Sequence, residues 1–237
     1  MGAPAADDRC RHRSSDKETG MGDFFAEFNA PDTDLTRQAH DFVFTAGTPA
    51  LAGHSARAYL FGRALGEARG LRPGADYDDE VLLLACLLHD LGLTDDGDGD
   101  QRFEVDGADR AASFLRDRGM DGERVRVVWE AIALHTSLGI ADRMRPEIAL
   151  THAGSGADVV AFGADALPDG LADRAHAAFP RLDTGRELTA AIVGQIARKA
   201  HKAPLGSLPA VLAAQAGVTV PTPQWSDLVA QAWKDAP

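Results

Sequence analysis

The segment CLLHDLGL, residues 86–93, places His89 and Asp90 at the end of a strongly apolar run. Burying an imidazole and a carboxylate among leucines is costly unless another group compensates both. A divalent metal does so, because it binds a neutral imidazole nitrogen and an anionic oxygen together. One His-Asp dipeptide is weak evidence by itself, since it also fits a helix-terminal histidine beside a surface aspartate.

Two further polar residues in apolar surroundings strengthen the metal hypothesis. His54 lies upstream in GHSARAYLFG, and Asp158 lies downstream in the apolar segment EIALTHAGSGADVVAFG. An aspartate in such a segment is costly if it faces the core unpaired. Four candidate ligands on three expected helices form the kind of site that is built inside helical bundles. We therefore predict a metal centre held by His54, His89, Asp90 and Asp158.

The ordered pattern of His54, then His89-Asp90, then Asp158 resembles the signature of the HD metalloenzyme superfamily. The segments HSARAY, LLHDLGL, RFEVDGADRAASFL and ALHTSLGIA are more closely similar to its cyanamide hydratase-like branch, over residues 33–165. The resemblance implies a helical domain that binds one or two divalent metals. We take Zn²⁺ as the leading candidate, with Fe²⁺, Mn²⁺, Ni²⁺ and Co²⁺ as alternatives.

Three residues near these segments are candidates for catalysis, each with a simpler alternative. His135, in WEAIALHTS, binds a second metal or substrate, or is only a helix-terminal histidine. Thr136 positions a small substrate through its hydroxyl, or only ends the helix. Glu104, in RFEVDGADRA, moves protons, or is a helix N-terminal acid that the dipole favours.

Two other residues share helices with the expected ligands. Arg57 follows His54 by one turn, so it either pairs with Asp90 or Asp158 or holds an anionic substrate. His152 precedes Asp158 by six residues, which separates the two side chains by roughly 120° around a helix. We therefore do not expect His152 to share the metal, and we retain Arg57 as a catalytic candidate.

The elements that carry these residues are all expected to be helices. Hydrophobic residues make up 45% of the 237 residues and aromatics only 6%, and apolar positions recur at helical spacing without strand alternation. We predict an all-α protein with one HD-type domain at 23–205 and a C-terminal helical appendage at 206–237. Residues 1–22 are small, charged and aperiodic, and we expect them to be a disordered extension. Expected helices are 33–43, 51–69, 77–91, 105–118, 122–135, 145–162, 171–178, 185–200, 208–216 and 225–233.

The acidic run TDDGDGD, residues 94–100, follows the His-Asp segment. Its acids lack the glycine and the twelfth-position glutamate of a calcium loop, so we interpret it as a solvated loop and a candidate mobile lid. The formal net charge of −12 argues against nucleic acid and anionic membranes as partners. With two cysteines and no apolar signal region, we expect a cytoplasmic protein that acts on a small molecule. A homo-oligomer stays open.

Three functions fit these residues. The leading hypothesis is that metal-activated water adds to a small nitrile-type compound such as cyanamide, giving urea. The alternative is an HD-type phosphohydrolase acting on a nucleotide or another phosphomonoester, which would need cations around the metal, whereas Arg57 is the one that the sequence suggests. The third is a di-iron oxygenase, which would need His135 or His152 at a second metal. A regulatory protein that binds metal without catalysis is the remaining class.

Overall fold

In the computed structural model, residues 24–221 and 223–234 are described, and every regular element within them is helical. The all-α prediction is confirmed, whereas the extension predicted at 1–22 lies outside the described residues. Short 3₁₀ turns include η1 (Leu91–Leu93), η2 (Ala141–Arg143) and η4 (Ala200–Lys202). The α-helices are α1 (Phe24–Glu27), α2 (Asp34–Ala46), α3 (Pro49–Ala68), α4 (Asp79–Leu88), α5 (Phe103–Asp117), α6 (Gly122–Leu134), α7 (Pro146–Val160), α8 (Leu171–Ala178), α9 (Thr184–Arg198), α10 (Leu208–Gln215) and α11 (Trp225–Gln231).

Short polar side chains start several of the helices. Thr33 and Thr48 accept hydrogen bonds from backbone amides in the first turns of α2 and α3. Asp78 and Asp121 do the same for α4 and α6. Each cap satisfies amide groups that the first turn leaves without a helical partner. The sequence therefore fixes where these helices begin.

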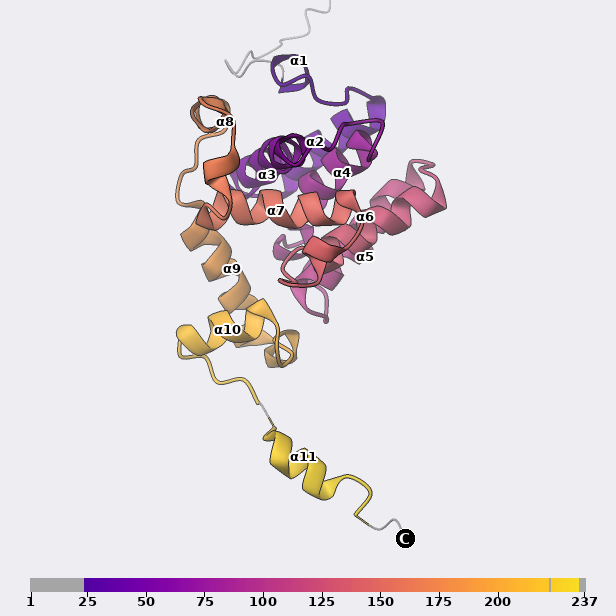
Figure 1. The fold of residues 1–237 in the computed structure, drawn as a ribbon. Coiled ribbons are helices and arrows are strands. Elements are labelled where there is room, and N and C mark those ends of the chain that lie inside the picture. Colours follow the sequence, from indigo (N-terminus) through magenta and orange to yellow (C-terminus); the bar gives the residue numbers. More distant parts are fainter. Residues whose placement is uncertain (1–23, 222, 235–237) are drawn as a thin grey trace, which may run out of the picture.

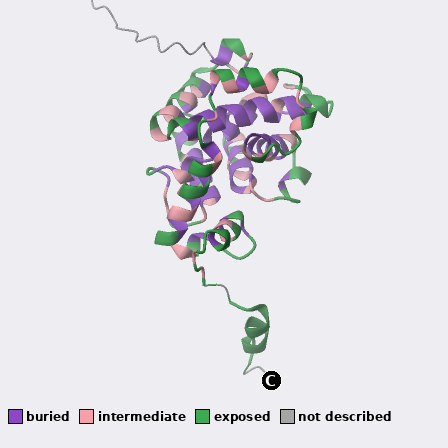
Figure 2. Ribbon diagram, turned by 90° about the vertical axis from the view of Figure 1, so that its left-hand side faces the viewer, coloured by how far each residue is buried: buried purple, intermediate pink, exposed green. Residues whose placement is uncertain are grey.

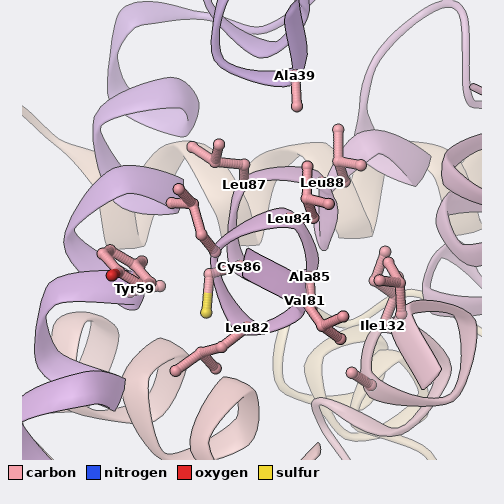
Figure 3. Packing of buried hydrophobic residues seen from close by; sticks show 14 of the residues in the cluster. Ala39, Tyr59, Val81, Leu82, Leu84, Ala85, Cys86, Leu87, Leu88 and Ile132 are labelled. Carbon is pink, nitrogen blue, oxygen red and sulfur yellow. The ribbon is translucent and has the colours of Figure 1, made fainter. Parts of the chain in front are cut away.

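Helix α4 forms the centre of the hydrophobic core. Its residues 81–88 are all buried, and the side chains point in every direction around the helix axis (Figure 3). Helices α2, α3, α6 and α7 pack around it. A helix that is apolar on all sides is stable only when neighbours cover it completely. His89 and Asp90 directly follow this buried helix, and both are themselves buried.

Helices α3 and α7 cross at very short range because glycines face the neighbouring backbone. A Cβ on Gly62 would crowd the carbonyl oxygen of Leu150, and a Cβ on Gly154 would overlap that of Ala58. The two pairs are four residues apart on both helices in opposite directions, so the helices run antiparallel in register. This close crossing fixes the distance between the polar residues one turn further along.

The C-terminal helices α9 and α10 pack against each other at one end of the molecule (Figure 1). A second apolar cluster, separate from the main core, joins them to the start of α5 through Phe103, Ile192, Ile196, Ala203 and Ala213. Helix α11 extends beyond them and is exposed along its length (Figure 2). Among the described residues, no helix is long and apolar enough to cross a membrane.

The acidic loop is anchored to the C-terminal helices. Lys202 is buried, and its Nζ lies 2.6 Å from Asp98 Oδ1 and 2.8 Å from Asp106 Oδ2. Arg198 and Lys199 contact Asp98 as well. The loop is therefore solvated only in part: Asp95, Asp96 and Asp100 are exposed, whereas Asp98 is held by these cations. A role as a mobile lid stays a prediction. The cations come from a segment about one hundred residues away in sequence, which local composition does not reveal.

Candidate metal centre

His54, His89 and Asp90 form a compact, buried cluster of metal-binding atoms. One ligand atom from each lies within 4.8 Å of the others. The Nε2 atoms of His54 and His89 are 3.0 Å apart. Asp90 Oδ2 lies 3.5 Å from the first nitrogen and 3.3 Å from the second. Helix α3 supplies His54, and the other two residues directly follow α4.

The hydrogen bonds behind the two imidazoles determine which nitrogens face the cluster with lone pairs. His89 Nδ1 donates to the carbonyl oxygen of Cys86 at 2.7 Å, and His54 Nδ1 donates to Asp158 Oδ2 at 2.7 Å. A carbonyl and a carboxylate only accept, so both Nδ1 atoms carry the proton in neutral rings. Two Nε2 lone pairs and a carboxylate then converge on one point. This donor set fits a divalent metal, as does the orientation of each histidine from behind.

His135 directs a third imidazole toward the same carboxylate. It follows α6, its Nδ1 donates to the carbonyl oxygen of Ile132 at 2.6 Å, and its Nε2 lies 3.7 Å from Asp90 Oδ1. Its ring centroid is 4.8 Å from that of His89. Burial, together with the neighbouring His89, lowers the pKa of His135 to about 4, so the ring is neutral at pH 7. His135 thus borders the three-residue cluster.

Asp158 lies behind His54. Besides the bond from His54, its carboxylate accepts two hydrogen bonds from Arg57, at 2.6 Å to Oδ1 and 2.8 Å to Oδ2. It lies one turn beyond the Gly154 contact of α7, while His54 lies one turn before Ala58 on α3. The antiparallel crossing therefore brings this pair together. Direct metal ligation by Asp158 stays a prediction, and in this geometry the residue orients His54.

Arg57 forms the ion pair with Asp158, which is one of the two roles that the sequence left open. It is completely buried, and its Nη1 donates to the carbonyl oxygens of Phe179 and Pro180. Its Nη2 also reaches the hydroxyl of Thr184 at 3.2 Å. The guanidinium is thus occupied by protein groups, and a role on substrate has no support from this position.

Neighbouring basic side chains determine the ionisation of the buried aspartates. Burial alone would raise the pKa of Asp90, but His89 and then His54 and His135 outweigh it and hold that pKa below its usual range. Asp90 in turn raises the pKa of His89 against the opposing effect of burial. The pKa of Asp158 is likewise lowered, because bonds from His54 and Arg57 outweigh burial. Both aspartates are therefore anionic at neutral pH.

Glu104 is completely buried at the start of α5 and bonded to Thr136 and Arg102. Arg102 donates to it at 2.6 and 3.0 Å, and the Thr136 hydroxyl donates to it at 2.5 Å. Burial raises the pKa of Glu104, but the effects of Arg102, His135 and Thr136 outweigh burial, so the pKa lies below its usual value. The carboxylate is thus ionised and holds the Thr136 hydroxyl in one orientation. A proton-shuttle role for Glu104 stays a prediction.

Residues 51–167 match the family model of the HD domain, and they include all four predicted metal ligands. Over these residues, slightly under half of the chain, the protein is similar to an HD domain. The family generally comprises metal-dependent hydrolases, which agrees with the convergent donor set of His54, His89 and Asp90. A comparison with curated proteins gave no match. The similarity to the cyanamide hydratase-like branch therefore stays a prediction.

A pocket of about 340 Å³ opens over His54, His89 and Asp90, the three candidate ligands that we call the metal cluster. His54, His89, Asp90 and His135 line it, together with Thr136, whose hydroxyl faces Glu104. Most of the wall is apolar and comes from the start of α5, the end of α7, and α9 and α10. Among the described residues, the pocket lining contains neither lysine nor arginine. The apolar wall residues include Phe103, Val159, Leu188, Ile192, Leu208 and Leu212.

Sequence reasoning missed two groups of residues around the HD site. Arg102 is the cation that orders Glu104 and Thr136, and its position two residues before Glu104 was the available signal. The apolar wall from α9 and α10 lies outside the matched residues 51–167. Its apolar residues repeat at a spacing of four, which predicts a buried face but does not show what that face covers. His152 also lines the pocket, and its Nδ1 donates to the carbonyl oxygen of His135 at 2.6 Å.

Proposed function

We propose that this protein is a metal-dependent hydratase or hydrolase that uses activated water on a small, uncharged molecule with a carbon–nitrogen group. Cyanamide is the simplest such substrate, and addition of one water across its C≡N bond gives urea. His54, His89 and Asp90 would hold the metal, Zn²⁺ being our first choice, and Asp158 is the fourth proposed ligand. A divalent ion supplies a Lewis acid that acidifies water and polarises the bond under attack.

The main support for this proposal is the mainly apolar lining of the pocket. In the part of the chain that the structure describes, the residues that line the pocket above His54, His89 and Asp90 are mainly apolar and include no lysine or arginine. A phosphate group needs cationic partners to replace its hydration, and the described lining residues supply none; Arg102, at the pocket edge, is already paired with Glu104. An uncharged substrate needs none. The apolar wall therefore favours a neutral group over a phosphomonoester at this site.

The Thr136 hydroxyl favours a substrate with an N–H donor. Its proton is committed to Glu104, which is ionised and can only accept. Toward the pocket, the oxygen therefore offers a lone pair rather than a proton. An amino group, as in cyanamide or an amide, would donate to it and be oriented relative to His135. This is the positioning role that we propose for Thr136, with Glu104 and Arg102 holding it.

Product assays after incubation with cyanamide test the proposal. The metal-loaded full chain should form urea and release no phosphate from a panel of nucleoside monophosphates. Asp90→Asn should abolish urea formation, whereas His201→Ala, at an exposed histidine of η4, should retain it. Metal analysis of protein purified without added metal should give one zinc per chain. Phosphate release without urea, or two irons per chain, would reject the proposal.

Phosphomonoester hydrolysis is the second candidate, because of one cation. Arg102 Nη2 lies 3.2 Å from Thr136 Oγ1, at the edge of the pocket. Its guanidinium is paired with Glu104, so it would have to serve both carboxylate and phosphate. The panel of nucleoside monophosphates distinguishes this candidate directly. Under it, Arg102→Gln should raise the KM for the phosphate substrate at least about tenfold, by loss of a charged hydrogen bond.

A further inference from the structure

The pocket is much larger than cyanamide requires. Its volume is about 340 Å³, whereas an apolar cavity of about 150 Å³ is enough to hold benzene. Cyanamide has three non-hydrogen atoms and would leave most of this space to water. Water in contact with apolar walls is readily displaced by an apolar group, because burying such a group is favourable.

The pocket joins a group of buried polar residues to an apolar wall that reaches the surface. His54, His89, Asp90 and His135 are the buried polar group. Leu208 is 38% exposed, so α10 lies on the side toward solvent. A molecule that fills this pocket would therefore have a polar head at the metal cluster and an apolar part extending outward.

The apolar wall from α9 and α10 is held firmly in place. Lys202 bonds to Asp98 and Asp106, and the Gln195 side chain donates to the carbonyl oxygen of Gly92 at 2.7 Å. Gly92 follows Asp90 by two residues, so α9 is tied to the segment that carries the metal ligands. A wall fixed in this way can discriminate between substrates by size and polarity.

We propose that the natural substrate carries an apolar group, about the size of a benzene ring or a short alkyl chain, beside the reacting carbon–nitrogen group. This group would lie between Leu188 and Ile192 of α9 and Leu208 and Leu212 of α10. The inference rests on the proposed function, because that function places the reacting group at the metal cluster. It makes α9 and α10, which lie outside the residues matched by the HD family, the part of the chain that selects the substrate.

Binding of neutral nitriles to the metal-loaded full chain tests this inference without requiring turnover. The probes are acetonitrile, butyronitrile and benzonitrile, with acetamide, butyramide and benzamide as their hydration products, and the measurement is calorimetric affinity. We expect the affinity to rise about fourfold for each buried methylene group. Benzonitrile should bind more tightly than acetonitrile by a still larger factor.

Two variants on α10 form a matched pair. Leu208→Ser should lower the ratio of benzonitrile to acetonitrile affinity at least about fivefold, because it removes apolar wall. Val211→Ser, at a half-exposed residue of the same helix that does not line the pocket, should leave the ratio unchanged. An affinity that is independent of the apolar group, or equal effects of the two substitutions, would overturn the inference. Urea formation from cyanamide is scored separately, so that it can fail while the size dependence holds, or hold while the size dependence fails.

Discussion

The imidazoles of His54, His89 and His135 are oriented by hydrogen bonds that their Nδ1 atoms donate. Cys86 supplies a carbonyl oxygen to His89, Asp158 supplies a carboxylate to His54, and Ile132 supplies a carbonyl oxygen to His135. Such bonds fix the tautomer and the ring plane, and they raise the basicity of the opposite nitrogen. In neutral rings the three Nε2 atoms would therefore face Asp90 as acceptors, an arrangement that is favourable only with a cation, a proton or a metal ion, between them.

Substitution of either residue of the His-Asp pair tests the metal cluster. We expect His89→Ala and Asp90→Ala to abolish metal binding, measured by elemental analysis after dialysis against Zn²⁺. In the unsubstituted chain, free metal at 100 times Kd should raise the free energy of unfolding by about 2.7 kcal/mol, and both variants should lose this gain. His201→Ala serves as the control and should keep it. Full metal occupancy in both variants would contradict the assignment.

Removal of the buried cation behind the site should be strongly destabilising. Arg57→Met leaves the Asp158 carboxylate buried without its charge partner, so we expect a loss of about 3–5 kcal/mol in the free energy of unfolding. Adding Asp158→Asn should recover part of that loss, because the uncompensated charge disappears. Urea unfolding of the metal-free single and double variants measures both effects. A loss below about 1 kcal/mol for Arg57→Met would show that the ion pair is not a main determinant of stability.

At the scale of elements, the antiparallel crossing of α3 and α7 sets the geometry behind the metal cluster. The pairs Gly62–Leu150, Ala58–Gly154 and His54–Asp158 follow one another at four-residue steps along both helices. Glycine at two of these steps lets the backbones approach closely. Any side chain there would separate the helices and lengthen the His54–Asp158 hydrogen bond.

Alanine at the crossing should therefore be costly. Gly154→Ala places a Cβ against the carbonyl oxygen of Ala58, and we expect a loss of about 1–3 kcal/mol or more in the free energy of unfolding. Gly156→Ala, on the same helix, meets only the Cβ of Phe162 at 3.7 Å, and should be neutral or stabilising by up to about 1 kcal/mol. Urea unfolding of the two variants gives the comparison. Equal effects would exclude the close crossing as the cause.

Over the molecule as a whole, the C-terminal helices line the pocket from outside the residues that match the HD domain. Helices α9 and α10 contribute its apolar side, and the buried Lys202 ties them to the acidic loop. A buried ammonium is stable only with close anionic partners, so Asp98 and Asp106 are required to balance it. The acidic loop, which follows the segment of His89 and Asp90, is thus bonded to the segment between α9 and α10.

This connection should weaken in acid. Bonds from Lys202 and Arg198 outweigh burial and lower the pKa of Asp98 from 3.8 to about 2. Because the folded-state pKa lies below the unfolded value, the contribution is complete well above pH 3.8 and is lost as pH falls through about 2. Asp98→Asn should cost about 1–3 kcal/mol at pH 7, and the difference from the unsubstituted chain should shrink toward pH 2. Urea unfolding between pH 7 and pH 2 measures this difference.

Asp100→Asn is the matched control for that experiment. Asp100 belongs to the same loop and lies 3.4 Å from Lys199, but its side chain is 86% exposed. A surface ion pair of this kind contributes about 0–1 kcal/mol, so the substitution should change stability little at any pH. If Asp98→Asn behaved in the same way as Asp100→Asn, the loop would not be anchored by Lys202.

The sequence alone determined the helical fold and the residues of the metal cluster. Caps such as Asp78 and apolar periodicity are local signals, so the helices could be predicted close to their observed bounds. His89 and Asp90 were conspicuous because an apolar run buries both, and their cost of burial can be judged from the neighbouring residues. The order of His54, His89-Asp90 and Asp158 supplied the resemblance that the HD family match supports.

Which groups each of these side chains contacts is visible only in the tertiary structure. In the sequence, a contact of Arg57 with a substrate was as plausible as one with Asp158. The crossing of α3 and α7 places Arg57 against Asp158. The composition of the acidic loop predicts a solvated segment, whereas in the structure its Asp98 bonds to Lys202, about one hundred residues later. The apolar residues of α9 and α10 have the spacing of a buried face, and only the structure shows that this face lines the pocket. These contacts join residues far apart in the chain, and their energies depend on distances that local sequence patterns do not contain.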